Sequence, residues 1–383
     1  MSLTIPLPPN YFLQPPLSSA EQERYFELAQ DATKDLIAVT HLEKSPITWS
    51  RDPTDDGNQS YMLYKGHDVS APPGVVTFMC TTQLDATLDE IAPLFAAYTQ
   101  DDLNEYRRRI APDALDLHQL YVLASPTRDF PNRLISIKYI LMKSGAPAIV
   151  RPRDMVVLDS NLDFECNGKR GFARAMRSIA LPCVPDLYDL HHIVRCYQHR
   201  GGYVFVESDV PGKVDAFQLY QVDLKGQIPT WVAALSIRTR ARSFEAIDRL
   251  VQENRLSRGA LLLDESQLVA KAARSRCSLC YAKFRVLFTP KARCRKCGEV
   301  MCHKCTQLWN VRTNGALKRV RVCKSCSTDK LVLSPGSCWL ATPSLPDETE
   351  RLTADDLLTN SSSKLTFDNS TMITTRSSME DDR

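Results

Sequence analysis

The sequence predicts an α+β domain of roughly 250 residues, followed by a small cysteine-rich module and a polar tail. Three observations support this prediction. Between residues 18 and 256, a helical pattern is followed by strand-like runs and then by another long helical pattern. Eight cysteines between residues 277 and 326 fall into four CxxC pairs. Beyond residue 329 the composition turns to Ser, Thr, Asp and Asn, which cannot bury a core.

The pattern of the N-terminal residues predicts an extended leader followed by a helix. The first 17 residues contain five prolines and lack the basic and apolar regions of a signal peptide. Ser18 and Glu21 have the spacing of a capping box, and apolar residues follow at helical spacing as far as Val39. A helix is therefore expected to begin at residue 18.

After Pro46 the pattern changes to that of mostly antiparallel strands. The predicted strands are 47–50, 60–64, 75–81, 117–123, 135–142, 155–161, 171–179, 193–199, 202–208 and 216–223. A second capping box, from Thr87 to Glu90, predicts a short helix within this series. The last helix is expected from about Pro229 to Asn254, with a break near Arg240–Ser243.

The four CxxC pairs supply ligands for two metal ions. They are Cys277, Cys280, Cys294, Cys297, Cys302, Cys305, Cys323 and Cys326. Two cysteines three residues apart reach one metal from a single tight turn, and tetrahedral zinc takes four such donors. Disulfides are the alternative, but five further cysteines are scattered singly, as in a reduced cytosolic protein. We therefore expect two structural Zn²⁺ ions; the spacing alone leaves RING-like and PHD-like cross-brace modules open.

The cysteine-rich segment is strongly basic. From Ala270 to Cys326 there are fifteen Lys and Arg residues against a single acid, Glu299. Such a concentration of positive charge attracts an anionic membrane surface or a nucleic acid. Nucleic acid is the less expected partner, because the sequence has no C2H2 pattern and no RNP-like aromatic motif. No apolar run approaches the roughly 18 residues of a membrane span, so any membrane attachment is expected to be peripheral.

The residues around the ligands resemble the FYVE zinc finger, at Cys294-Arg295-Lys296-Cys297-Gly298 and at Arg321-Val322-Cys323-Lys324-Ser325-Cys326. The resemblance implies interleaved zinc ions, one on Cys277, Cys280, Cys302 and Cys305 and the other on Cys294, Cys297, Cys323 and Cys326. It also implies binding to phosphatidylinositol 3-phosphate on endosomal membranes. The implied headgroup contacts are Lys291, Arg293, Arg295 and Arg321, and the implied membrane-insertion loop is Val286, Leu287 and Phe288.

Two parts of the FYVE pattern are missing. Leu268 and Lys271 stand where the family has Trp-x-x-Asp, and both histidines before the third cysteine are absent from Pro290–Arg293. In the family these residues select the 3-phosphate. We therefore expect a FYVE-related finger with reduced headgroup specificity. The apolar loop 284–289 has a second interpretation, as a strand packed inside the finger.

Three stretches of the larger domain resemble the START lipid-transfer domain: Arg153–Leu158, Gly171–Ala175 and Gln221–Trp231. In the last of these, a strand ends in a Lys225-Gly226 turn and Pro229 then opens a helix. The resemblance implies a helix-grip fold, in which the C-terminal helix is a lid over a curved antiparallel sheet and one lipid lies between them. Arg174 and Arg195 are candidate buried polar groups in this cavity, with surface exposure as the alternative for each.

The sequence as a whole predicts a non-enzymatic lipid-binding or lipid-transfer protein, cytoplasmic and peripheral on phosphoinositide-containing endosomal or other endomembranes. It contains no GxSxG, phosphate-cradling glycine loop or HExxH motif. The alternative is a scaffold or ubiquitin-ligase-like adaptor whose finger docks protein partners. The predicted parts are a leader (1–17), a START-like domain (18–256), a linker (257–269), a FYVE-related finger (270–328) and a disordered acidic Ser/Thr-rich tail (329–383).

Overall fold

The structure of the protein, a computed structural model, describes nine stretches of the chain. They are residues 5–8, 10–40, 45–53, 60–226, 228–258, 262–285, 290–313, 315–328 and 365–367. The chain divides into two compact units. The first is Met1–Ile247 together with Glu350–Arg383, and the second is Asp248–Thr349. The boundary falls inside helix α6 (Ser243–Arg258).

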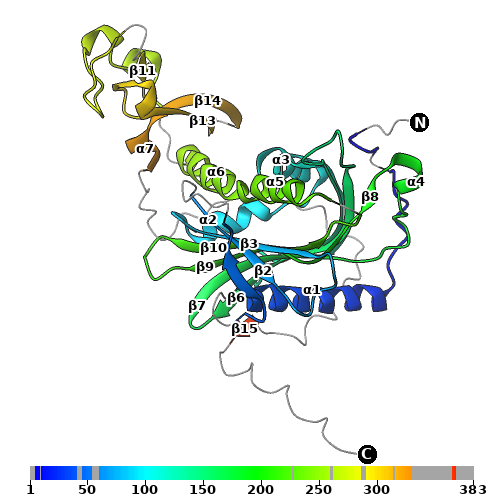
Figure 1. Cartoon of the computed structure of the whole chain (residues 1–383). Helices are drawn as coiled ribbons and strands as arrows, with labels where there is room; N and C mark the ends of the chain where they lie inside the picture. The colour runs from blue at the N-terminus through cyan, green and yellow to red at the C-terminus, as the bar shows by residue number, and fades with distance from the viewer. Residues whose placement is uncertain are drawn as a thin grey trace, which may run out of the picture. The chain divides into compact units, whose positions relative to one another are not determined.

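The first unit is built on one curved sheet (Figure 1). Its main path runs β1-β2-β3-β10-β9-β7-β6-β5-β4, and every neighbouring pair on this path is antiparallel. The strands are β1 (Thr48–Arg51), β2 (Met62–His67), β3 (Val76–Leu84), β4 (Ala114–Ala124), β5 (Leu134–Met142), β6 (Arg153–Cys166), β7 (Lys169–Ser178), β9 (Tyr197–Glu207) and β10 (Val214–Asp223). Two short strands, β8 (Val194–Arg195) and β15 (Leu365–Phe367), pair parallel with β6.

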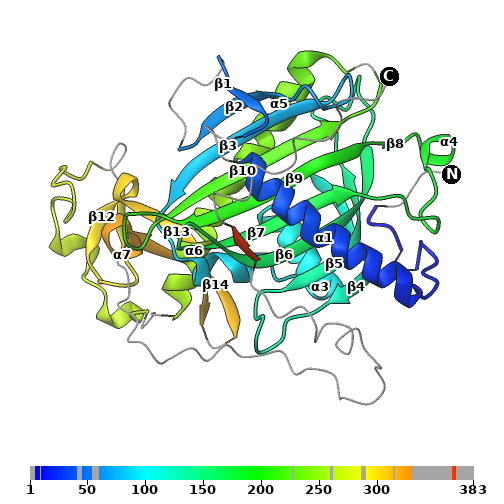
Figure 2. The same ribbon diagram turned by 90° about the horizontal axis from the view of Figure 1, so that it is seen from below.

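Helices cover both faces of this sheet (Figures 1 and 2). On one face, α1 (Ser19–Val39) packs against β6, β7 and β9 through Tyr25, Ala29 and Leu36. On the other face lie α3 (Gln100–Arg109) and α5 (Thr230–Ala241). The shorter helices are α2 (Leu88–Ile91), η1 (Ala92–Phe95) and α4 (Tyr188–His191). The unit is therefore the predicted α+β fold, with a large antiparallel sheet and a C-terminal helix.

The predicted start of the first helix and the predicted break in the last helix are both confirmed. Ser18 caps α1, and both hydrogen bonds of its capping box with Glu21 are present. The last helical segment is interrupted where the sequence predicted it, since α5 ends at Ala241 and α6 begins at Ser243.

The structure differs from the sequence prediction at three elements. The predicted strands 193–199 and 202–208 are largely one strand, β9, in which Gly202 passes close to the backbone of Arg174 on β7. Helix α3 was not predicted, since Leu103 is its only buried residue and it lacks an apolar stripe. Strand β15 lies in the segment 329–383, which was predicted to be disordered; the rest of that segment is outside the described residues.

The second unit contains two antiparallel hairpins. Strand β11 (Lys291–Arg293) pairs with β12 (Val300–Cys302), and β13 (Thr306–Thr313) pairs with β14 (Ala316–Cys323). The helical turns are η2 (Glu265–Gln267), η3 (Lys271–Ala273), η4 (His303–Cys305) and α7 (Lys324–Thr328). Its small core gathers six of the cysteines around Trp309, Val311 and Val322. In the described part of the whole chain, no helix is long and apolar enough to cross a membrane.

Candidate functional site

The structure brings the eight cysteines of the second unit together as two groups of four. One group is Cys277, Cys280, Cys302 and Cys305, and the other is Cys294, Cys297, Cys323 and Cys326. Within each group all the Sγ atoms lie within 4.8 Å of one another. The CxxC pairs therefore alternate between the groups along the chain, in the interleaved order that the resemblance implied.

The spacing of the sulfur atoms fits a tetrahedral metal. With Zn–S bonds of ~2.3 Å, two thiolates on one zinc lie about 3.8 Å apart. The Sγ atoms of Cys280 and Cys302 are 3.7 Å apart, far beyond the ~2.05 Å of a disulfide. Backbone N–H groups of Cys302 and Cys323 also point at the Sγ atoms of Cys277 and Cys294, 3.3 Å away in each case. Such donors stabilise thiolate charge, as a metal site requires.

The same turn places the first two ligands of each group. The N–H of Tyr281 donates to the carbonyl of Cys277 at 2.9 Å, and the N–H of Gly298 donates to that of Cys294 at 2.8 Å. Both Tyr281 (φ 58°) and Gly298 (φ 78°) are left-handed. The turn folds each CxxC back on itself, so that both of its sulfur atoms face one point. His303, which stands between two ligands, is exposed and outside both groups.

The four predicted headgroup residues are half-buried and already have partners inside the second unit. Lys291 Nζ donates to the carbonyl of Lys271 at 2.8 Å and lies 5.2 Å from the centre of the Phe284 ring. Arg321 Nη1 donates to Thr306 Oγ1 at 3.3 Å. The predicted insertion residues Val286, Leu287 and Phe288 lie outside the described part of the chain.

One carboxylate sits against two of these basic side chains. Glu265, on η2, forms ion pairs with Arg293 and Arg295, and its Oε2 lies 3.7 Å from Arg295 Nη1. The segment that carries it is held by the finger, because the N–H of Leu263 donates to the carbonyl of Arg295 at 2.8 Å. The carboxylate of Glu265 thus lies beside the basic side chains that were expected to contact a lipid phosphate. Sequence reasoning missed Glu265, which is separated from Arg293 by 28 positions.

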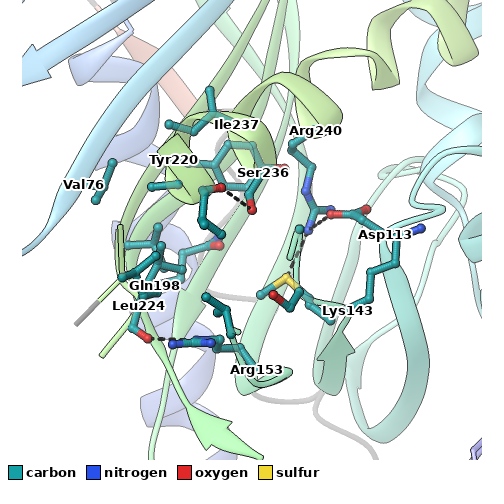
Figure 3. Close-up of a pocket in the computed structure, with 18 of the residues that line it drawn as sticks. Val76, Asp113, Lys143, Arg153, Gln198, Tyr220, Leu224, Ser236, Ile237 and Arg240 are labelled. Atoms are coloured by element: carbon teal, nitrogen blue, oxygen red, sulfur yellow. Dashed lines mark hydrogen bonds and ion pairs between the residues drawn. The ribbon is translucent and has the colours of Figure 1, made fainter. Parts of the chain in front are cut away.

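The first unit has a partly open cavity of about 100 Å³ beside α5 (Figure 3). Its wall is largely apolar, with residues such as Phe78, Val222, Val232 and Ile237. Polar groups stand among them: Arg240 Nη2 lies 2.9 Å from Asp113 Oδ2, and Arg153 donates to the carbonyl of Leu224 at 3.2 Å. Burial acts to lower the pKa of Arg240, but Asp113 holds that pKa above its ordinary value.

A smaller cavity of about 30 Å³ adjoins the first, since the two share part of their lining. The shared residues are Met142, Met155, Gln198, Tyr220 and Arg240. Lys138 and Arg174 also line the smaller cavity, and both pair with the buried Asp159. Burial acts to raise the pKa of Asp159, but Arg174 and Lys138 hold it well below its ordinary value.

The two arginines considered from the sequence differ in their surroundings. Arg174, on β7, is buried and lines the smaller cavity. Arg195 is half-buried, pairs with Asp154 at 2.8 Å and lines neither described cavity. Sequence reasoning missed Lys138, although a lysine in the apolar run Ile135–Met142 is a signal of a buried polar site.

The fold and the two sites define the class of protein: an α+β domain with a largely apolar cavity, followed by a module with two four-cysteine groups. Comparison with family models names the two modules. The START domain matches residues 116–251, and the FYVE zinc finger matches residues 267–331. The chain thus carries a START domain followed by a FYVE zinc finger.

Several solved structures are similar to this chain. Human StAR-related lipid transfer protein 5 is 14% identical, with a TM-score of 0.46, and the match covers 61% of this chain and 99% of that one. Human STARD10 is 16% identical, with a TM-score of 0.39, over 64% of this chain and 83% of that one. A STAR-related lipid transfer protein from Xanthomonas axonopodis is 18% identical, with a TM-score of 0.38, and the match covers 53% of this chain and 98% of that one. No curated protein matches the sequence.

Proposed function

We propose that this protein is a non-enzymatic lipid-binding or lipid-transfer protein. Its START domain takes up one lipid, and its zinc finger attaches it to anionic, phosphoinositide-containing membranes, such as those of endosomes. The observation that carries the proposal is the combination in one chain of a cavity with a largely apolar wall and a basic FYVE zinc finger. An apolar cavity with a few fixed polar groups is the kind of site that shields a hydrophobic ligand from water.

Uptake of a lipid requires a movement of α5. A cavity of about 150 Å³ in another protein binds ligands as small as benzene or xenon, and the larger cavity here measures about 100 Å³. Helix α5 supplies Val232, Ser236 and Arg240 to the wall, so its displacement enlarges the cavity directly. The helix is bounded by the left-handed Lys225-Gly226 turn before it and by the break at Arg242 after it, which are natural hinge positions.

We propose Zn²⁺ as the metal of both cysteine groups, because four thiolates at tetrahedral spacing are its typical structural site. The metal would hold the two hairpins and the turns between them in place, and it has no reaction to perform there. The basic side chains around Arg293 would then meet anionic headgroups.

Vesicle flotation with the full-length protein tests membrane binding. We expect binding to vesicles that contain phosphatidylinositol 3-phosphate, with loss of most binding when Lys291→Ala and Arg293→Ala are combined. The matched control is Lys318→Ala with Arg319→Ala, which removes the same charge from exposed residues of β14 in the same unit. Equal binding of both double variants would remove the assigned headgroup residues from the proposal.

Native mass spectrometry of the gently purified protein tests the lipid site. The expected result is a co-purified lipid of one molecule per chain. A chain that is lipid-free and stays so after incubation with vesicles would contradict lipid binding and favour the protein-docking scaffold.

A further inference from the structure

The inner end of the START cavity carries more buried positive than negative charge. Asp159 Oδ2 accepts from Lys138 Nζ and from Arg174 Nη2, at 2.7 Å each, and its Oδ1 accepts from Arg174 Nε at 2.9 Å. All three side chains are at least 95% buried. Among the described residues, Lys138 and Arg174 have no second carboxylate within ion-pair distance. One carboxylate therefore serves two cations.

The neighbouring charges do not remove this excess. Arg240 is paired with Asp113, so that pair is neutral by itself. Tyr106 lies under the guanidinium of Arg174, 4.6 Å from its ring centre, and burial raises the pKa of its hydroxyl above the ordinary value, so it stays uncharged. An uncompensated cation that is removed from bulk water is unfavourable, so the site favours an added anion.

Two details show the same imbalance at the level of atoms. Arg174 Nη1 is buried without a hydrogen-bond partner, although its other two nitrogens are satisfied. Burial lowers the pKa of the Lys138 ammonium, and Asp159 only partly opposes this because the charge of Arg174 acts in the same direction as burial. Both donors line the smaller cavity, which adjoins the larger, mostly apolar one.

We infer that the START cavity takes an amphiphile with an anionic head, a carboxylate or a phosphate, and that this head binds Lys138 and Arg174. The head supplies the missing negative charge and an acceptor for Arg174 Nη1. The apolar chain of the ligand runs from the smaller cavity into the larger one, whose wall includes Phe78, Val222 and Val232. The inference rests on the proposed lipid-binding function and specifies its ligand class.

Three probes with one common chain test the inference: oleate, oleyl phosphate and oleyl alcohol. Each is measured in radiolabelled form by equilibrium dialysis against the zinc-loaded full-length protein, below its micelle concentration. We expect at least one of the two anions to bind at least about tenfold more tightly than the alcohol. The tighter anion identifies the head as a carboxylate or a phosphate.

The decisive variant is Lys138→Met, which keeps the Asp159–Arg174 pair and removes the charge excess. It should bring the anions to within about twofold of the alcohol without lowering the melting temperature of the ligand-free protein. Arg174→Met makes the reciprocal change and keeps the Lys138–Asp159 pair. Lys169→Met is the matched control, because Lys169 pairs with the exposed Asp209 on the surface and should leave the preference intact.

The outcomes separate this inference from the proposed function. If the alcohol binds as tightly as both anions, or if Lys138→Met and Arg174→Met both keep the preference, the inference is wrong while lipid binding stands. If none of the three probes binds, both fail. Anion binding by the basic finger is told apart by its insensitivity to either cavity variant and by its loss at high salt.

Discussion

At the scale of single residues, the metal ligands can be recognised from the sequence, but the contacts between side chains that are far apart in the sequence cannot. The CxxC pairs could be predicted because each turn is local and its spacing is diagnostic, whereas their division into two interleaved groups was implied by the resemblance to the FYVE finger. The charge cluster of the cavity could not, since Lys138, Asp159 and Arg174 come from three different strands. Their register decides whether one carboxylate meets one cation or two, and register depends on the packing of the whole sheet.

Gly202 lies where strands β9 and β7 approach each other closely. It has a φ of 138°, and a Cβ there would lie 1.9 Å from the carbonyl oxygen of Arg174. Because that neighbour is backbone, it cannot rotate away. Gly202→Ala should therefore destabilise the START domain by at least about 3 kcal/mol, measured by urea unfolding. Gly168→Ala is the control: its φ is 74° but no atom lies within 4 Å, so only the backbone cost of about 1 kcal/mol is expected. Equal effects would show that the close approach is unimportant.

Glu265 competes with an anionic headgroup for Arg293 and Arg295. Glu265→Gln removes the charge and keeps the shape of the side chain. Because Glu265 is largely exposed, its ion pairs are weak, and the variant should bind phosphoinositide vesicles only about two- to fivefold more tightly. Vesicle flotation at two salt concentrations measures this. Glu23→Gln, the same change on the exposed side of α1, should have no effect. Unchanged binding in Glu265→Gln would mean that headgroups bind elsewhere on the finger.

At the scale of elements, helix ends that are specified by a few neighbouring residues were predicted correctly. Elements that depend on packing against distant parts of the chain were not. The capping box of Ser18 and the break between α5 and α6 are encoded within a few residues. Helix α3 has the capping box Thr99–Asp102 but almost no apolar face, so periodicity gave no sign of it. The parallel pairing of β15 with β6 joins Leu365 to Phe164, which are 201 positions apart, and no local pattern specifies such a contact.

The C-terminal half of α6 covers the free edge of β13 within the second unit. Arg249 donates to the carbonyl of Leu308 at 2.7 Å, and Ser257 Oγ accepts from the N–H of Arg312 at 2.9 Å. Between them, Glu253 Oε1 accepts from the N–H of Asn310 at 3.0 Å. These contacts alternate along the strand, so the helix satisfies the backbone groups that β14 does not reach.

Glu253→Ala should therefore destabilise the second unit. Its carboxylate is almost fully buried, and its loss leaves the N–H of Asn310 without an acceptor, at a cost of about 2 to 3 kcal/mol. The expected result is a lower melting temperature for the zinc-finger transition in differential scanning calorimetry. Glu245→Ala, an exposed position of the same helix, is the matched control and should be neutral. A neutral effect of both would show that the contact between Glu253 and Asn310 does not stabilise the finger.

At the scale of the whole molecule, the two compact units depend on different sources of stability. The described residues of the START domain form three apolar clusters, around Tyr139, Met79 and Leu117. In the described part of the second unit there is a single cluster, and five of its eleven buried residues are cysteines. A core of that size rarely suffices without metal ions or disulfides. The sequence predicted this division because the cysteine spacing and the strand patterns occupy separate stretches.

Metal removal should therefore unfold one unit and leave the other intact. We expect a strong chelator to release two Zn²⁺ per chain and to abolish amide protection in β11–β14, while β5 and β6 remain protected in hydrogen exchange. The segment 248–258 of α6 should lose protection with the finger, because its partners Leu308, Asn310 and Arg312 are then no longer held in place. Cys297→Ser should reproduce the effect at one site, whereas Cys166→Ser, outside both cysteine groups, should not. Protection of β13 and β14 that survives complete metal removal would show that the hairpins fold on their own apolar contacts, and it would leave the cysteine groups without the structural role assigned to them.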